Sequence, residues 1–131
     1  MLAPGPMFSF TRTFTQDEFD RFAAVSGDDN PIHVDPAFSA RTRFGRTVAH
    51  GMLLYSVLWG EIRRRAPDAR QTAQSLMFPA PTFTGEPMRF QGTVMRCDAR
   101  SATLALAVTR VADGETVCTA EAELAFAGGT P

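Results

Sequence analysis

The residues with the clearest capacity for chemistry are an aspartate and a histidine close together in the chain, Asp28 and His33. A carboxylate beside an imidazole is the commonest pair for moving a proton near neutral pH, because the pKa of each group can be shifted toward neutrality. Pro31 lies between them, and a proline-containing turn can direct both side chains toward one point. The spacing predicts a proton-transfer site. The alternative is that Asp28 caps a turn and His33 is a half-buried structural residue.

The same segment could instead bind a metal ion. Asp28 and Asn30 stand at the first and third positions of an EF-hand-like loop, but no glycine follows at the sixth position and no glutamate at the twelfth, so a calcium loop is rejected. His33 and Asp35 could ligate a transition metal, but they have no third clustered ligand besides Asp28. We therefore expect no metal and no other cofactor.

A second candidate feature is the run Ala49-His50-Gly51-Met52, which begins the longest predicted helix. The first amides of a helix have no partner within it and lie at the positive end of its dipole, so they can bind a developing oxyanion. Gly51, without a side chain, lets a carbonyl oxygen approach closely. Alternatively, Gly51 only eases the turn into the helix and His50 is a structural cap.

The helix that would present these amides is predicted from about His50 to Arg65. Leu54, Leu58 and Ile62 recur every four residues, and further apolar side chains widen their stripe until it covers most of the circumference. Such a helix is usually buried inside a fold. The arginines at 63–65 suit the negative end of the dipole, and the proline at 67 stops the helix.

Shorter elements are expected before this helix. A first strand is predicted around residues 8–14, followed by a helix that begins at Thr15 with Glu18 in a capping-box spacing and ends at Gly27. The segment 28–31 reads as a turn. Asp35 is expected to cap another short helix, which begins at Pro36.

Everything after about Ala73 is predicted to be strands. Alternating apolar residues, as in Met88, Phe90 and Val94, give each strand one buried and one wet face, which is typical of an antiparallel sheet. Asp113-Gly114 marks a tight hairpin turn. A sheet curled around a central helix is the hot-dog architecture, an α+β fold. Without a repeat or linker, residues 1–131 are expected to form a single domain.

Composition excludes several classes of function. The formal net charge of -1 gives no general attraction to nucleic acid or to anionic membranes. All 13 basic residues are arginine, which rules out Schiff-base lysine chemistry and a Walker-type phosphate loop. Cys97 and Cys118 are expected to be buried free thiols. No signal peptide or membrane-spanning run is found, so a soluble, cytoplasmic protein is expected.

At this point two motifs become recognisable together. The run 26–35, Ser-Gly-Asp-Asp-Asn-Pro-Ile-His-Val-Asp, and the run 44–52, Phe-Gly-Arg-Thr-Val-Ala-His-Gly-Met, resemble the signature of the MaoC-like R-specific enoyl-CoA hydratases. That signature continues with a small residue six positions after the histidine, where Ser39 stands here. The separation of the motifs and the strand-rich tail also fit, so the resemblance covers nearly the whole chain.

The resemblance implies a hot-dog enzyme that reversibly hydrates 2-enoyl thioesters to (R)-3-hydroxyacyl thioesters. Asp28 and His33 would hold and activate one water, Asn30 would shape the turn, and the Gly51 amide would steady the thioester enolate. His50 is a further candidate for contact with the substrate. Asp29 stands at a variable position and brings a second carboxylate next to Asp28. If exposed, it does little.

On the long helix, some relatives carry a serine in the acyl pocket where Trp59 stands here, and Ser56 lies about a turn earlier as a supporting candidate. Tyr55 and Trp59 would either shorten the acyl pocket or fill the core. Proteins of this family are usually dimers, so a homodimer is implied.

Four functions remain open. The first is a hydratase of acyl-CoA. The second is a (R)-3-hydroxyacyl dehydratase whose substrate is carried by acyl carrier protein. A hot-dog thioesterase is less favoured, because Glu61 is the only carboxylate in the long helix and lies toward its far end. A non-catalytic acyl-binding protein is disfavoured by the intact motifs.

Overall fold

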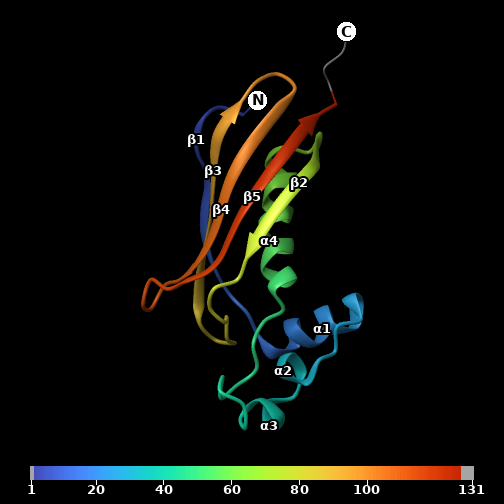
Figure 1. Ribbon diagram of the computed structural model, residues 1–131, viewed down its shortest axis with the longest axis vertical. Helices are drawn as coiled ribbons and strands as arrows, with labels where there is room; N and C mark the ends of the chain where they lie inside the picture. Colours follow the sequence, from blue (N-terminus) through green and yellow to red (C-terminus); the bar gives the residue numbers. More distant parts are fainter. Residues whose placement is uncertain (1, 128–131) are drawn as a thin grey trace.

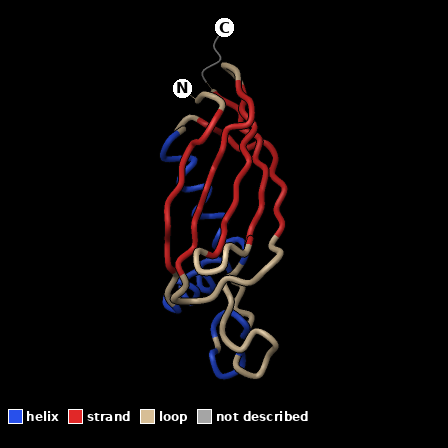
Figure 2. Tube along the Cα trace, turned by 90° about the vertical axis from the view of Figure 1, so that its left-hand side faces the viewer, coloured by secondary structure: helices blue, strands red, loops and turns tan. Residues whose placement is uncertain are grey.

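The computed structural model, which describes residues 2–127, contains one sheet of five antiparallel strands. The strands are β1 (Gly5–Thr13), β2 (Ala69–Met77), β3 (Pro87–Cys97), β4 (Ser101–Arg110) and β5 (Thr116–Phe126). Their order is β1-β3-β4-β5-β2, so β1 and β2 are the edges. Figure 2 shows the strands side by side, with the long helix lying along the sheet.

The long helix α4 (Gly51–Arg65) forms as its sequence predicted, with His50 at its N-cap position. Its buried side chains pack against alternating residues of the sheet, which include Met88, Phe90 and Leu104. The sheet curls over α4 as the sequence predicted, and it leaves one strip of the helix exposed. Met52, Ser56 and Gly60 form an exposed strip with a spacing of four residues, because the strands of one chain cover only one side of α4 (Figure 1).

The three short helices gather beyond one end of the sheet (Figure 1). They are α1 (Gln16–Ser26), α2 (Pro31–Val34) and α3 (Pro36–Ser39). The capping box of Thr15 and Glu18 and the left-handed Gly27, with φ of 82°, are confirmed at the two ends of α1. Asp35 caps α3 by accepting a hydrogen bond from the Phe38 amide. Helix α2 was not anticipated, since the segment 28–31 was predicted to be a turn and no helix was predicted between it and Asp35.

The strand pattern follows the sequence closely. β2 begins somewhat earlier than expected, at Ala69, and Gly114 adopts the positive φ of 72° that the hairpin between β4 and β5 requires. Cys118 is buried, Cys97 is half-buried, and both are free thiols. Within residues 2–127, no helix combines the length and the hydrophobicity that crossing a bilayer requires.

Candidate active site

His33 is held in one orientation by a main-chain carbonyl. Its Nδ1 lies 2.8 Å from the carbonyl oxygen of Val48. Because a carbonyl oxygen only accepts hydrogen bonds, Nδ1 carries the hydrogen, and Nε2 of the neutral ring has the free lone pair. The ring is buried, with 8% of the residue exposed. The local structure thus prepares Nε2 as a proton acceptor.

The Asp28 carboxylate faces that nitrogen. Its Oδ2 lies 3.8 Å from His33 Nε2, which is too long for a direct hydrogen bond. An ionised carboxylate and a lone-pair nitrogen both accept hydrogen bonds, so one water between them can donate to both. The Asp28 side chain is 56% exposed, so water has access to it. The pair predicted from sequence is therefore brought together.

The turn that carries Asp28 uses its other carboxylate oxygen. Oδ1 accepts a long hydrogen bond of 3.4 Å from the Asn30 amide, and the Asn30 side chain accepts one of 3.1 Å from the Ile32 amide, which starts α2. Asn30 therefore shapes the turn as expected and also caps the helix that bears His33. Asp28 caps the turn through Oδ1 while its Oδ2 faces the imidazole. A capping role is therefore compatible with a role in proton transfer. Asp29 is exposed.

His50 lies behind the pair instead of on a cavity wall. Its Nε2 is 2.8 Å from the main-chain carbonyl oxygen of Asp28, and its ring stacks on the His33 ring with centroids 3.8 Å apart. Only 2% of the residue is exposed. Burial lowers the pKa of His50, and the adjacent His33 lowers it further. The neutral ring therefore donates from Nε2, and its Nδ1 has no partner among residues 2–127.

The three side chains could in principle attract a metal. Ligand atoms of Asp28, His33 and His50 all lie within 4.8 Å of one another. Each imidazole uses one nitrogen to donate to a carbonyl oxygen, an arrangement that is also common for histidines that bind metals, and this leaves one nitrogen per ring free. The hydrogen bonds suit proton transfer, and we assign no metal to the cluster.

A cavity of about 300 Å³ adjoins His33. His33 and Gly51 both line it, and most of its wall is apolar, including Ile32, Val48, Leu54, Phe78, Pro79 and Val117. Gly51 is the first residue of α4, so its amide lies at the positive end of the helix dipole. The cavity thus joins a proton acceptor to a helix amide that could bind an oxyanion.

Gly51 is also required by its contact with Phe78. A Cβ at position 51 would lie 2.6 Å from an edge atom of the Phe78 ring, closer than any ordinary van der Waals contact. Phe78 follows β2 and is 42% exposed. Its ring therefore forms a wall beside the helix amide that the sequence did not reveal.

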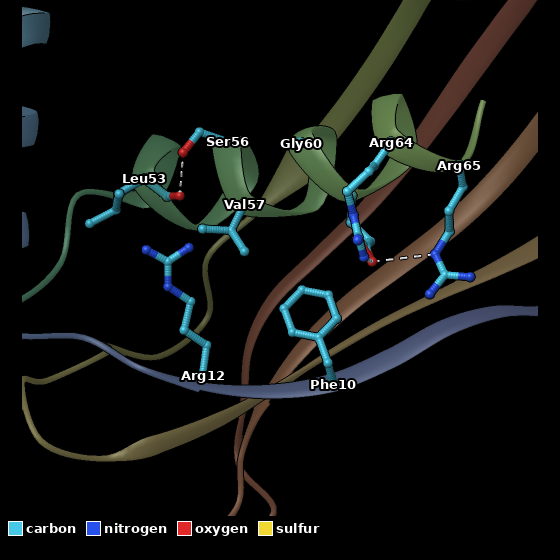
Figure 3. Close-up of a pocket in the computed structure, with 9 residues that line it drawn as sticks. Phe10, Arg12, Leu53, Ser56, Val57, Gly60, Arg64 and Arg65 are labelled. Atoms are coloured by element: carbon cyan, nitrogen blue, oxygen red, sulfur yellow. Dashed lines mark hydrogen bonds and ion pairs between the residues drawn. The ribbon is translucent and has the colours of Figure 1, made fainter. Parts of the chain in front are cut away.

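Ser56 does not line the cavity that His33 and Gly51 share. It lines a separate cavity of about 560 Å³ between α4 and β1, and its hydroxyl donates to the Leu53 carbonyl (Figure 3). Glu61 lies in this second cavity as well, where ion pairs with Arg64 and Arg65 hold it and the Arg64 hydrogen bonds lower its pKa.

The two aromatic residues of α4 belong to the core. Tyr55 is buried and its hydroxyl donates to the Gln71 side chain, while Trp59 packs against the core cluster. Neither side chain lines the cavity beside His33.

Two residues brace the site from a distance in sequence. Gln16 of α1 donates from Nε2 to the His33 carbonyl at 2.8 Å and accepts from the Thr47 hydroxyl at 2.6 Å. Ser39, buried, donates to the Ile32 carbonyl at 3.2 Å. The motif drew attention to Ser39. No pattern in the sequence pointed to Gln16, because its partner lies in another helix.

Comparison with known proteins gives consistent likenesses. A family model described as "MaoC like domain" matches residues 3–116. An (R)-specific enoyl-CoA hydratase from Aeromonas caviae is 38% identical over 107 residues, which are 79% of this chain and 80% of that protein. A mitochondrial 3-hydroxyacyl-[acyl-carrier-protein] dehydratase from Arabidopsis thaliana is 34% identical over 86 residues, and the match spans only 52% of its length.

Solved structures agree with the fold. An (R)-hydratase from A. caviae involved in PHA biosynthesis has a TM-score of 0.87 at 34% identity, and the match covers 94% of this chain and 96% of that one. An unliganded R-hydratase from Pseudomonas aeruginosa also has a TM-score of 0.87, at 30% identity, with 95% and 82% covered. The predicted α+β hot-dog fold is confirmed.

Proposed function

Because the chain belongs to the family of MaoC-like domains, we propose that it is a lyase that hydrates 2-enoyl thioesters reversibly to (R)-3-hydroxyacyl thioesters. Acyl-CoA is the favoured substrate, since the relative from A. caviae bears that activity in its name. The observation that carries the proposal is the separation of 3.8 Å between Asp28 Oδ2 and His33 Nε2, beside a cavity that also contains Gly51.

In the proposed reaction one water lies between Asp28 and His33. Its oxygen bonds to C3 of the substrate as one of its protons passes to the pair, and a proton from the pair forms the new bond to C2. The pair thus ends with the protons that it had at the start, and no cofactor is needed. Positioned acid–base groups of this kind typically contribute a hundredfold or more to the rate.

The thioester carbonyl gains negative charge as the bond to C3 forms. In our proposal the Gly51 amide donates to that oxygen, aided by the dipole of α4. Loss of one such donor typically raises the barrier by about 3 kcal/mol. Asn30 supports the reaction by capping the helix that carries His33. His50 is a positioning residue, because it contacts both members of the pair through its hydrogen bond and its ring stack.

A dehydratase acting on acyl carrier protein is the second candidate, since it runs the same chemistry in reverse and the A. thaliana relative bears that name. A thioesterase is less well supported. Glu61, the carboxylate that α4 could offer, is bound by two arginines in the cavity away from His33.

We further propose that residues 1–131 act as one domain in a cytoplasmic homodimer. The two free thiols suit a reducing compartment. β2 is an edge strand whose end carries the exposed Met77, and an edge with exposed apolar residues is a ready surface for pairing with a second copy.

Mixing the purified protein with crotonyl-CoA tests the reaction. We expect the conjugated enoyl absorbance to fall without release of free thiol, and the product to be the (R) enantiomer on chiral separation. Release of thiol at the same rate would identify hydrolysis instead. No change in either signal would contradict a hydratase with this substrate.

A further inference from the structure

A single arginine lies at the cavity beside the proposed catalytic pair. Arg43 is one of the residues that line it, together with His33 and Gly51. Its side chain is exposed, and its guanidinium carbon lies 4.9 Å from the centroid of the Phe44 ring, which also lines the cavity. Contact with an aromatic face restrains a guanidinium without neutralising it. Arg43 therefore presents a restrained positive charge at the solvent side of the cavity.

The cavity wall offers no carboxylate to offset that charge. The residues that line the cavity include neither aspartate nor glutamate. Among residues 2–127 Arg43 forms no ion pair, whereas nearby Arg46 is paired with Glu86 at 3.2 Å. If a bound ligand extends out of the cavity at this side, an anionic group on it can accept two hydrogen bonds from the Arg43 guanidinium.

The cavity has a buried interior and an exposed side. Leu54, Val117 and Thr82 are buried, while Arg43, Phe78 and Pro79 are exposed, and Arg43 is the charged residue among these three. An acyl group would gain most from the interior, so the carrier portion of a thioester would leave past Arg43. Both coenzyme A and the prosthetic arm of acyl carrier protein carry phosphate on that portion.

We propose that Arg43 binds a phosphate of the thioester carrier and so makes the site selective for phosphorylated carriers. This inference rests on the proposed hydratase function. The shared ligand chemistry is a phosphate ester, supplied either by the 4′-phosphopantetheine group common to both carriers or by the nucleotide of coenzyme A.

Three crotonyl thioesters test this role: those of coenzyme A, of 4′-phosphopantetheine and of pantetheine, which has no phosphate. The quantity to measure is the ratio of kcat/KM for each phosphorylated substrate to that for crotonyl-pantetheine. In Arg43→Ala we expect the ratio for crotonyl-CoA to fall about tenfold or more, the usual worth of a charge-assisted hydrogen bond. The loss should lie mainly in KM, because this contact binds substrate and transition state alike.

Two variants serve as controls. Arg43→Lys keeps the charge but not the fork of donors, and should restore part of the ratio. Arg89→Ala removes another exposed arginine, on β3, that does not line the cavity, and should leave the ratio as in the wild type.

The outcomes separate the two proposals. If the ratio falls for both phosphorylated substrates in Arg43→Ala, Arg43 binds the phosphate that they share. If it falls for crotonyl-CoA alone, Arg43 binds a phosphate of the nucleotide. An unchanged ratio in Arg43→Ala, with wild-type enzyme active on all three substrates, would overturn the role of Arg43 only. A wild-type protein that hydrates none of them, including crotonyl-pantetheine, would overturn the proposed function itself.

Discussion

At the scale of single residues, two main-chain carbonyls decide which nitrogen of each imidazole carries a hydrogen. Val48 accepts from His33 Nδ1, and Asp28 accepts from His50 Nε2. The first bond leaves the His33 lone pair facing the Asp28 carboxylate. The second ties the backbone of Asp28 to a ring stacked on His33. The pair is thus held from behind by groups that need not touch the substrate.

The lowered pKa of His50 predicts a pH dependence of stability. As pH falls below the ordinary value of 6.5, the unfolded chain binds a proton at His50 while the folded chain does not, so stability is lost. His50→Gln removes this titration and keeps a donor for the Asp28 carbonyl. Between about pH 7.5 and pH 5.5, the melting temperature of the variant should fall less than that of the wild type. Equal falls would show that His50 titrates normally in the folded chain.

The contact between Gly51 and Phe78 predicts a paired effect on activity. Gly51→Ala keeps the amide but places a methyl group where the Phe78 ring lies, so the ring must leave its place on the cavity wall. We expect kcat/KM for crotonyl-CoA to drop by about tenfold or more, since a small displacement near the reacting atoms is costly. Adding Phe78→Ala should recover part of the loss. A double variant that is no more active than Gly51→Ala alone would contradict this account.

At the scale of elements, the features readable from sequence are those whose partners lie within a few residues. The Thr15 and Glu18 box, Gly27 and the Asp35 cap each depend on neighbours three or four positions away, and all are found. Helix α2 was missed because Asn30-Pro31 serves equally for a turn and for a capped helical start. The position of His33 depends on α2, because this single turn of helix carries it.

Contacts between distant elements could not be predicted. Gln16 of α1 donates to the His33 carbonyl, and the Val48 carbonyl accepts from the His33 ring. Phe78, which directly follows β2, packs on Gly51. Each contact depends on how the elements pack, which periodicity does not specify. The sequence therefore drew attention to the candidate pair and to Asn30 and Ser39, but not to the contacts that Gln16, Val48 and Phe78 make from other elements.

The packing of β1 on β3 predicts a stability difference between two glycines. A Cβ at Gly92 would lie 2.5 Å from the ring of Phe8, which is buried in the core. Gly92→Ala should therefore lower the free energy of unfolding by about 1–3 kcal/mol in urea titrations. Gly60→Ala, on the exposed strip of α4 with no atom near the new methyl group, should raise it by up to about 1 kcal/mol. An unchanged free energy of unfolding in Gly92→Ala would show that the Phe8 ring can move aside without loss of stability.

At the scale of the whole molecule, one chain leaves an edge strand and one side of its central helix uncovered. The segment that follows β2, from Phe78 to Thr82, also lines the cavity beside His33. An assembly that fixes the β2 edge would therefore fix a wall of the proposed site, which links the homodimer to activity.

Sedimentation equilibrium should give twice the mass of the 14.3 kDa chain. Met77→Asp places a charge at the end of β2 on a side chain that is 67% exposed, and should weaken the dimer and lower crotonyl-CoA hydration together. Met95→Asp, at a comparably exposed position on β3, should leave both unchanged. If Met77→Asp stays dimeric, the interface lies elsewhere.

The most direct measurement of the central claim is the rate of crotonyl-CoA hydration in Asp28→Asn and His33→Ala, with Asp29→Asn as the matched control. We predict that each of the first two changes lowers kcat by about a hundredfold or more, because each removes one of the two groups that hold the water. Asp29→Asn, which neutralises the exposed neighbouring carboxylate, should stay within a few-fold of the wild type. Circular dichroism checks that all three variants are folded. A near-normal rate in either Asp28→Asn or His33→Ala would contradict the account.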